Sequence, residues 1–159
     1  MTAGRGFVSA ALVLAVLAPA DAATAVPIGA PGCLSAVRTG VIPAWARGGF
    51  NEPKPRMPHV LGRSGRIVAL LFAYPLLAPP PRDHNNKILW VARKNDGSSL
   101  RIRAQRMVGS TRVGAPVSRT FRGGPGPSFV NFPKPGCWRL TLRWSDQVDS
   151  LDLQYRHAG

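Results

Sequence analysis

PGCWRLTLRW, residues 135–144, is the stretch that decides the fold. Apolar and polar side chains alternate along it with a period of two, as in a strand with one buried and one solvated face. Its apolar positions are Trp138, Leu140, Leu142 and Trp144. The alternation returns in LDLQYR, residues 151–156, after the polar run SDQVDS, which predicts an antiparallel hairpin. Across this hairpin Arg139 and Arg143 can pair with Asp152, and a solvated pair contributes a few tenths of a kcal/mol, roughly.

Several runs upstream also have strand character. RIVALLFAY (66–74) and NKILWVAR (86–93) are rich in β-branched and aromatic residues, and LRIRAQRM (100–107) alternates cleanly. Shorter runs lie near residues 113–121 and 128–132, and proline- or glycine-rich turns separate all of them. About six to eight short strands predict an all-β fold, an immunoglobulin-like β-sandwich over residues 66–159, with a small barrel as the alternative.

Residues 1–25 have the pattern of a secretory signal peptide. Arg5 precedes an apolar run at 7–18, and small residues with A-x-A spacing follow it. The run is shorter than the ~20 residues that a membrane-spanning helix needs. We therefore expect an exported protein with no transmembrane helix after cleavage, an uncleaved anchor being the alternative. Residues 26–65 are rich in proline and glycine and are expected to form a long irregular segment packed on the domain.

The chain is strongly basic, with 21 Lys and Arg against 7 Asp and Glu and a formal net charge of +14. Such a charge favours anionic partners, and we expect phospholipid or a cell-wall polymer of the envelope. The candidate contact residues are the arginines on the polar sides of the alternating strands: Arg101, Arg103, Arg139 and Arg143. No basic run exceeds two residues, and no specific nucleic-acid partner is predicted. The alternative is that the charge is compositional and spread over solvated faces.

The two cysteines, Cys33 and Cys137, are predicted to form a disulfide, as is usual for a cysteine pair in an exported protein. The bridge would close a loop of roughly a hundred residues and tie the N-terminal segment to the last hairpin. Free thiols are the alternative. A reactive thiol is not favoured, because the sequence has no Cys-x-x-Cys motif and no helix start beside either cysteine.

Metal and catalytic sites have candidate residues but no recognisable spacing. Met57, His59 and His84 are possible soft ligands for copper or another metal, with ordinary surface histidines as the alternative. The acidic residues lie mostly in predicted turns, and no paired carboxylates stand out for acid–base catalysis. We therefore predict no enzyme and no cofactor. The leading function is a non-catalytic envelope or secreted binding module, with metal handling or a small secreted enzyme as alternatives.

Four blocks of the sequence resemble a group of exported actinobacterial proteins with an immunoglobulin-like sandwich and a C-terminal PGCW-strand hairpin. The blocks are PAWARGGF (43–50), MPHVLGRSGRIVALLFAYPL (57–76), NNKILWVAR (85–93) and PSFVNFPKPGCWRLTLRWSDQVDSLDLQY (127–155). The resemblance implies an exported bacterial β-domain and transfers no catalytic residue. Polar residues within these blocks form a further candidate pocket: His59, Arg63, Asn86 and Lys87.

Overall fold

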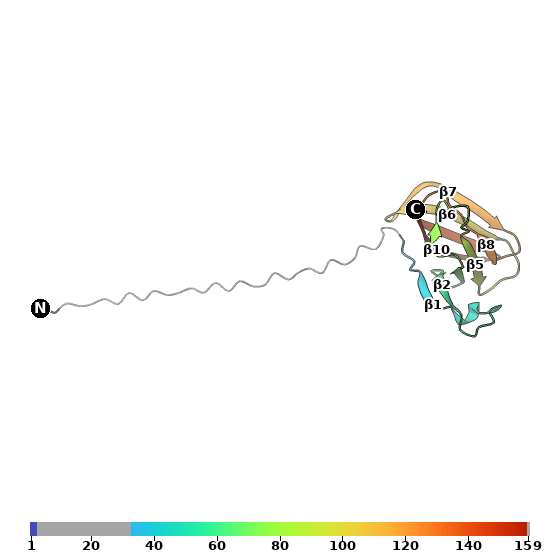
Figure 1. The fold of residues 1–159 in the computed structure, drawn as a ribbon, viewed down its shortest axis with the longest axis horizontal. Helices are drawn as coiled ribbons and strands as arrows, with labels where there is room; N and C mark the ends of the chain where they lie inside the picture. Colours follow the sequence, from blue (N-terminus) through green and yellow to red (C-terminus); the bar gives the residue numbers. More distant parts are fainter. Residues whose placement is uncertain (3–32, 159) are drawn as a thin grey trace.

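The computed structural model describes residues 1–2 and 33–158, and shows two five-stranded sheets packed face to face as a sandwich. Sheet A has the order β1-β2-β3-β5-β8, with β1 Arg38–Val41, β2 Arg56–Leu61, β3 Ile67–Leu71, β5 Lys87–Ala92 and β8 Pro127–Phe129. Sheet B has the order β4-β10-β9-β6-β7, with β4 Leu76–Leu77, β6 Leu100–Val108, β7 Thr111–Phe121, β9 Gly136–Trp144 and β10 Gln147–Arg156. Figure 1 shows β6 and β7 on one side of the domain and β1 and β2 on the other. The predicted all-β sandwich is confirmed, while the predicted signal peptide lies, apart from residues 1–2, outside the described residues.

The C-terminal hairpin forms as predicted and is longer than expected. Strands β9 and β10 pair from Trp144 opposite Gln147 to Gly136 opposite Tyr155. Only Ser145 and Asp146 remain in the turn, so most of the SDQVDS run belongs to β10. Ser145 has a positive φ of 47°, the left-handed backbone that the favoured two-residue hairpin turns require.

The apolar side of this hairpin packs into the core between the two sheets. Trp138, Leu140, Leu142 and Trp144 are each no more than 3% exposed. Phe132 stacks on Trp138 with ring centroids 4.2 Å apart, and Tyr155 meets Phe132 edge-on at 4.9 Å. The Tyr155 hydroxyl donates a hydrogen bond to the carbonyl of Val130, and burial raises the pKa of that hydroxyl far above its usual value. The alternation in the opening stretch therefore sets which side chains fill the core.

The expectation of an irregular segment over residues 26–65 needs correction, because its described part, residues 33–65, contains β1, β2 and the 3-10 helix η1 (Ala44–Ala46). A second apolar cluster explains the difference: Ile42 and Ala46 pack on Val68 and Leu70, the residues of β3 that point away from the main core. All five residues of β3 are buried, so its continuous apolar run needs cover on both faces. The sandwich therefore begins with β1 and not at residue 66.

The described residues contain no helix with the length and apolar character that a bilayer crossing requires.

Candidate anion-binding face

The four arginines predicted as contact residues share the outer face of sheet B. Side chains alternate along β6 and β9, and the inward positions of both strands belong to the core. In the paired register Arg101 lies opposite Arg143, and Gln105 lies opposite Arg139. Arg112 of β7 lies on the same face. Its partner in the register is Met107 of β6, and Met107 in turn lies opposite Cys137 of β9. Arg112 could not be assigned to this face from the sequence, because β7 has no clear alternation.

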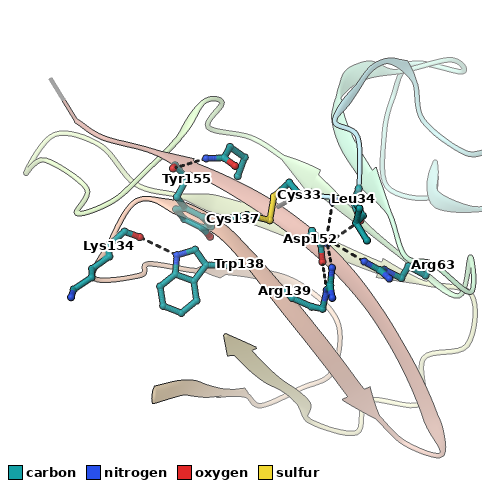
Figure 2. Close-up of a disulfide and its surroundings, with 11 residues drawn as sticks. Cys33, Leu34, Arg63, Lys134, Cys137, Trp138, Arg139, Asp152 and Tyr155 are labelled. Carbon is teal, nitrogen blue, oxygen red and sulfur yellow. Dashed lines mark hydrogen bonds and ion pairs between the residues drawn. A yellow bond between two sulfur atoms is a disulfide. The ribbon is translucent and has the colours of Figure 1, made fainter. Parts of the chain in front are cut away.

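Arg139 is held by a buried carboxylate. Its Nε lies 2.9 Å from Oδ1 of Asp152, and its Nη2 lies 3.1 Å from Oδ2. The Asp152 side chain is fully buried, and it also accepts hydrogen bonds from the backbone N–H of Leu34 at 2.9 Å and from Arg63 at 3.2 Å. Figure 2 shows Leu34, Arg63 and Arg139 converging on this carboxylate. Arg139 therefore serves the fold and is not a free surface charge.

The ionisation of Asp152 follows from these contacts. Burial alone opposes a charged carboxylate. The hydrogen bonds from Arg139 and Leu34, and the charges of Arg139 and Arg63, outweigh that penalty and lower the pKa of Asp152 below its usual value of 3.8. The hydrogen bond to Asp152 in turn raises the pKa of Arg139. Asp152 is consequently an ionised, multiply hydrogen-bonded group at neutral pH.

The predicted disulfide joins Cys33 to Cys137, which are 104 positions apart in sequence and whose Cα atoms are 5.3 Å apart. It lies beside the Asp152 cluster (Figure 2). The segment that follows Cys33 runs along β10, where the Ser35 hydroxyl accepts a hydrogen bond from the backbone N–H of Asp152. The disulfide thus fixes the cover over this end of sheet B, and such bonds are typical of oxidising compartments.

The remainder of the face is open. Within residues 33–158, no salt bridge or side-chain hydrogen bond is formed by Arg101, Arg103, Arg112 or Arg143. One recess of about 320 Å³ lies at the end of the face and is lined by Ser98, Ser99, Arg101, Arg143, Trp144 and Ser145. A second, of about 30 Å³, lies between Arg103, Gln105, Arg112, Arg139 and Thr141. The smaller recess has room for about one water molecule.

The candidate pocket of four polar residues is not assembled. His59 is 5% exposed and hydrogen-bonds the carbonyl of Met57, while Arg63 belongs to the Asp152 cluster. Asn86 is fully buried, where its amide hydrogen-bonds both backbone groups of Leu77. The Lys87 ammonium lies 5.4 Å from the centre of the Phe72 ring. Each of the four residues has separate partners, so the structure places them in four different local environments.

Of the residues proposed as soft metal ligands, His84 belongs to a different hydrogen-bond network from Met57 and His59. Met57 and His59 are neighbours on the outer side of β2, and His84 lies in a loop, within 3.2 Å of the Asn86 side-chain oxygen. In the described part of the chain no three His, Cys, Asp or Glu residues gather into a group that could hold a metal ion.

A second buried acid was overlooked in the sequence. Asp149 of β10 is 3% exposed and accepts hydrogen bonds from the backbone N–H groups of Ser64 and Arg66, both at 2.9 Å. Gly62 is required for this approach, because a Cβ atom there would lie 2.3 Å from an Asp149 oxygen. The turn GRSGR, residues 62–66, therefore surrounds the Asp149 carboxylate and connects sheet A to sheet B. The available signal was the position of Asp149 in the alternation of β10, because it falls on the same side as the apolar residues Leu151 and Leu153.

Comparison of the chain with protein-family models, curated proteins and solved structures gives no match.

Proposed function

We propose that this chain is a non-catalytic, exported binding module whose outer face of sheet B holds phosphate-bearing polymers or lipids of the cell envelope. The observation that carries the proposal is the group of arginines, unpaired within residues 33–158, on one face of sheet B. Arg101, Arg103, Arg112 and Arg143 lie there without an acidic partner among the described residues. A face of this kind attracts polyanions through summed charge and through the guanidinium preference for phosphate oxygens.

The charge balance of the strands supports this choice of face. The four long strands of sheet B contain eight arginines: Arg101, Arg103, Arg106, Arg112, Arg119, Arg139, Arg143 and Arg156. They contain only two acids, Asp149 and Asp152, and both are buried and hydrogen-bonded. The solvent-facing charge of sheet B is therefore positive throughout, whatever the composition of the rest of the chain.

We further propose an immunoglobulin-like topology. Strands β3, β5 and β8 take the places of A, B and E, and β6, β9 and β10 take those of C, F and G, with β7 extending this second sheet. One feature departs from antibody domains: the disulfide joins an N-terminal segment to β9 and does not bridge the two sheets. Export is supported by the disulfide and by the signal-peptide pattern of residues 1–25.

Vesicle binding tests the proposal. We expect the protein to co-sediment with vesicles that contain anionic phospholipid and not with purely zwitterionic vesicles. Added salt should release the bound protein, because it screens the charges. Isolated cell-wall polymer in a parallel arm distinguishes the two sources of phosphate. Replacement of Arg101, Arg103 and Arg143 by Gln should abolish binding in either arm.

A charge-matched control separates this face from net charge. The control variant replaces three exposed arginines outside the face, Arg56, Arg82 and Arg119, by Gln. Equal loss of binding in both triple variants would mean that the whole-molecule charge, and not this face, attracts the partner. Binding that persists in high salt would also contradict the proposal.

A further inference from the structure

We infer that the larger recess on the arginine face, lined by Arg101 and Arg143, is a site for a single tetrahedral oxyanion, a phosphate group. This inference rests on the proposed function and deepens it, because it names the chemical group that the face recognises and the place where it sits. The recess measures about 320 Å³ and lies where the loop before β6 meets the β9–β10 turn.

The two arginines form a cross-strand pair of like charge. Arg101 and Arg143 are directly opposite each other in the register of β6 and β9. Residues in this relation have Cβ atoms about 5 Å apart, so both guanidinium groups can reach one point between them, and like charges there repel. Neither side chain has an acidic partner in residues 33–158. A bound anion would relieve the repulsion, and this gives the site a specific source of affinity.

The walls of the recess are fixed by contacts around it. The indole N–H of Trp144 donates to the carbonyl of Lys94 at 2.7 Å, and the Lys94 ammonium lies 3.0 Å from an Asp146 oxygen. The Ser145 hydroxyl donates to Asp96, which also accepts from the backbone N–H of Ser98. These bonds join the loop before β6 to the hairpin turn. The recess is therefore a built concavity and not a gap between mobile side chains.

Asp96, the acid that is hydrogen-bonded to the lining residues Ser98 and Ser145, is already engaged. Hydrogen bonds from Ser145 and Ser98 lower the pKa of Asp96 to about 2, so this carboxylate is ionised at neutral pH and accepts the hydrogen bond that the Ser145 hydroxyl donates. Ser145 therefore presents only acceptor lone pairs to the recess, and the donors available to a ligand include the two guanidinium groups and the Ser99 hydroxyl. The local charge from Arg101, Arg143 and Asp96 remains positive.

This donor set fits a phosphate better than a carboxylate. A guanidinium binds two oxygens of one anion side by side, so a carboxylate that meets two arginines must share its two oxygens between them. A phosphate has further oxygens for the second arginine and for a hydroxyl donor. The smaller recess beside Arg139 lacks this capacity, because it is about 30 Å³ in volume and Arg139 is committed to Asp152.

Titration of the purified full chain with inorganic phosphate, followed by 1H–15N NMR at constant ionic strength, tests the inference. We expect saturable shifts confined to Ser98, Ser99, Arg101, Arg143, Ser145 and the Trp144 indole. Acetate should bind at least tenfold more weakly than phosphate. The Arg101→Gln/Arg143→Gln variant should lose at least tenfold in phosphate affinity, and Arg119→Gln, exposed on the other side of the sheet, should bind as the parent does.

The outcomes separate this inference from the proposed function. Shifts that do not saturate, that spread over all arginines, or that are equal for phosphate and acetate overturn the recess as a phosphate site. If vesicle binding is nevertheless lost in the Arg101/Arg103/Arg143 variant, the face still binds anions and only the localised site is rejected. If phosphate saturates the recess but no vesicle or polymer is bound, the proposed function fails while the site stands.

Discussion

Arg139 and Arg143 lie four residues apart on the same face of β9, yet they have opposite roles in this structure. Arg139 faces Asp152 across the hairpin, is 19% exposed, and forms two hydrogen bonds to that carboxylate. Arg143 faces Val148 on β10 and Arg101 on β6, and its side chain is exposed. The difference shows that the cross-strand neighbour, and not the residue type, decides whether an arginine stabilises the fold or remains free for a ligand.

The same contrast divides the outer face of sheet B. At the Arg139 end, the disulfide and residues 33–35 cover the sheet and bury Asp152. At the Arg143 end, nothing in residues 33–158 covers the arginines, and a recess of about 320 Å³ remains. The Arg139 end is therefore the closed end of the face, and the expected effects on stability are largest there.

The largest effect is expected from Asp152→Ala. The change leaves Arg139 without its carboxylate and leaves the Leu34 N–H without an acceptor, and loss of one partner of a buried ion pair costs about 3–5 kcal/mol. Urea unfolding measures the loss. The control is Asp146→Ala, which removes an exposed partner of Lys94 and should change the unfolding midpoint little. Similar midpoints for the two variants would show that the Asp152 cluster contributes no more than a surface pair.

Removal of the disulfide should come next. The Cys33→Ala/Cys137→Ala variant opens the loop between two positions that are 104 apart in sequence, and the expected loss of unfolding free energy is about 2–4 kcal/mol. Reductant should destabilise the parent by a similar amount and leave the variant unchanged. We also expect faster amide exchange at Leu34, because its hydrogen bond to Asp152 depends on the cover that the disulfide fixes. Protection at Leu34 that survives reduction would contradict this dependence.

The sequence predicted most features of the closed end, but it did not predict that Asp152 is buried there. Alternation placed the hairpin and the arginines correctly, and two cysteines in an expected secreted chain predicted the bridge. The pair of Arg139 with Asp152 was expected to be a solvated one. Its cover comes from Leu34, 118 residues away in sequence, and no local pattern reports such a contact.

The recess and the first two strands were missed for related reasons. Prolines made residues 26–65 look irregular, although Pro58 of β2 pairs only with β1 and lies outside the register with β3, where a missing N–H is tolerated. The recess arises only where the loop before β6 meets the β9–β10 turn, through contacts such as Trp144 with Lys94. Periodicity predicts which face a side chain occupies, and it carries no information on which loops meet in space.

A smaller effect should appear in acid. The folded-state pKa of Asp152 lies below its unfolded value near 3.8, so its contribution to stability is complete above that pH. The contribution is then lost as the pH falls through the folded pKa. Urea unfolding of the parent should therefore show a steeper loss of stability below about pH 4 than Asp152→Asn does. Asp96 and Asp146 have pKa values lowered to about 2, so the unfolding free energy of both proteins still depends on pH through these two residues. Parallel pH profiles would contradict the ionised, buried state of Asp152.

The most direct test of the account compares Arg139→Gln with Arg143→Gln in two assays, urea unfolding and phosphate titration. Arg139→Gln should lose about 2 kcal/mol of stability, because a charged hydrogen-bond partner of a buried acid is removed, and should still bind phosphate. Arg143→Gln should change stability by no more than about 0.5 kcal/mol, because the site is exposed, and should lose at least tenfold in phosphate affinity. The same profile for both variants, or the reverse assignment, would contradict the claim that one face of β9 carries a structural arginine and a ligand-binding one.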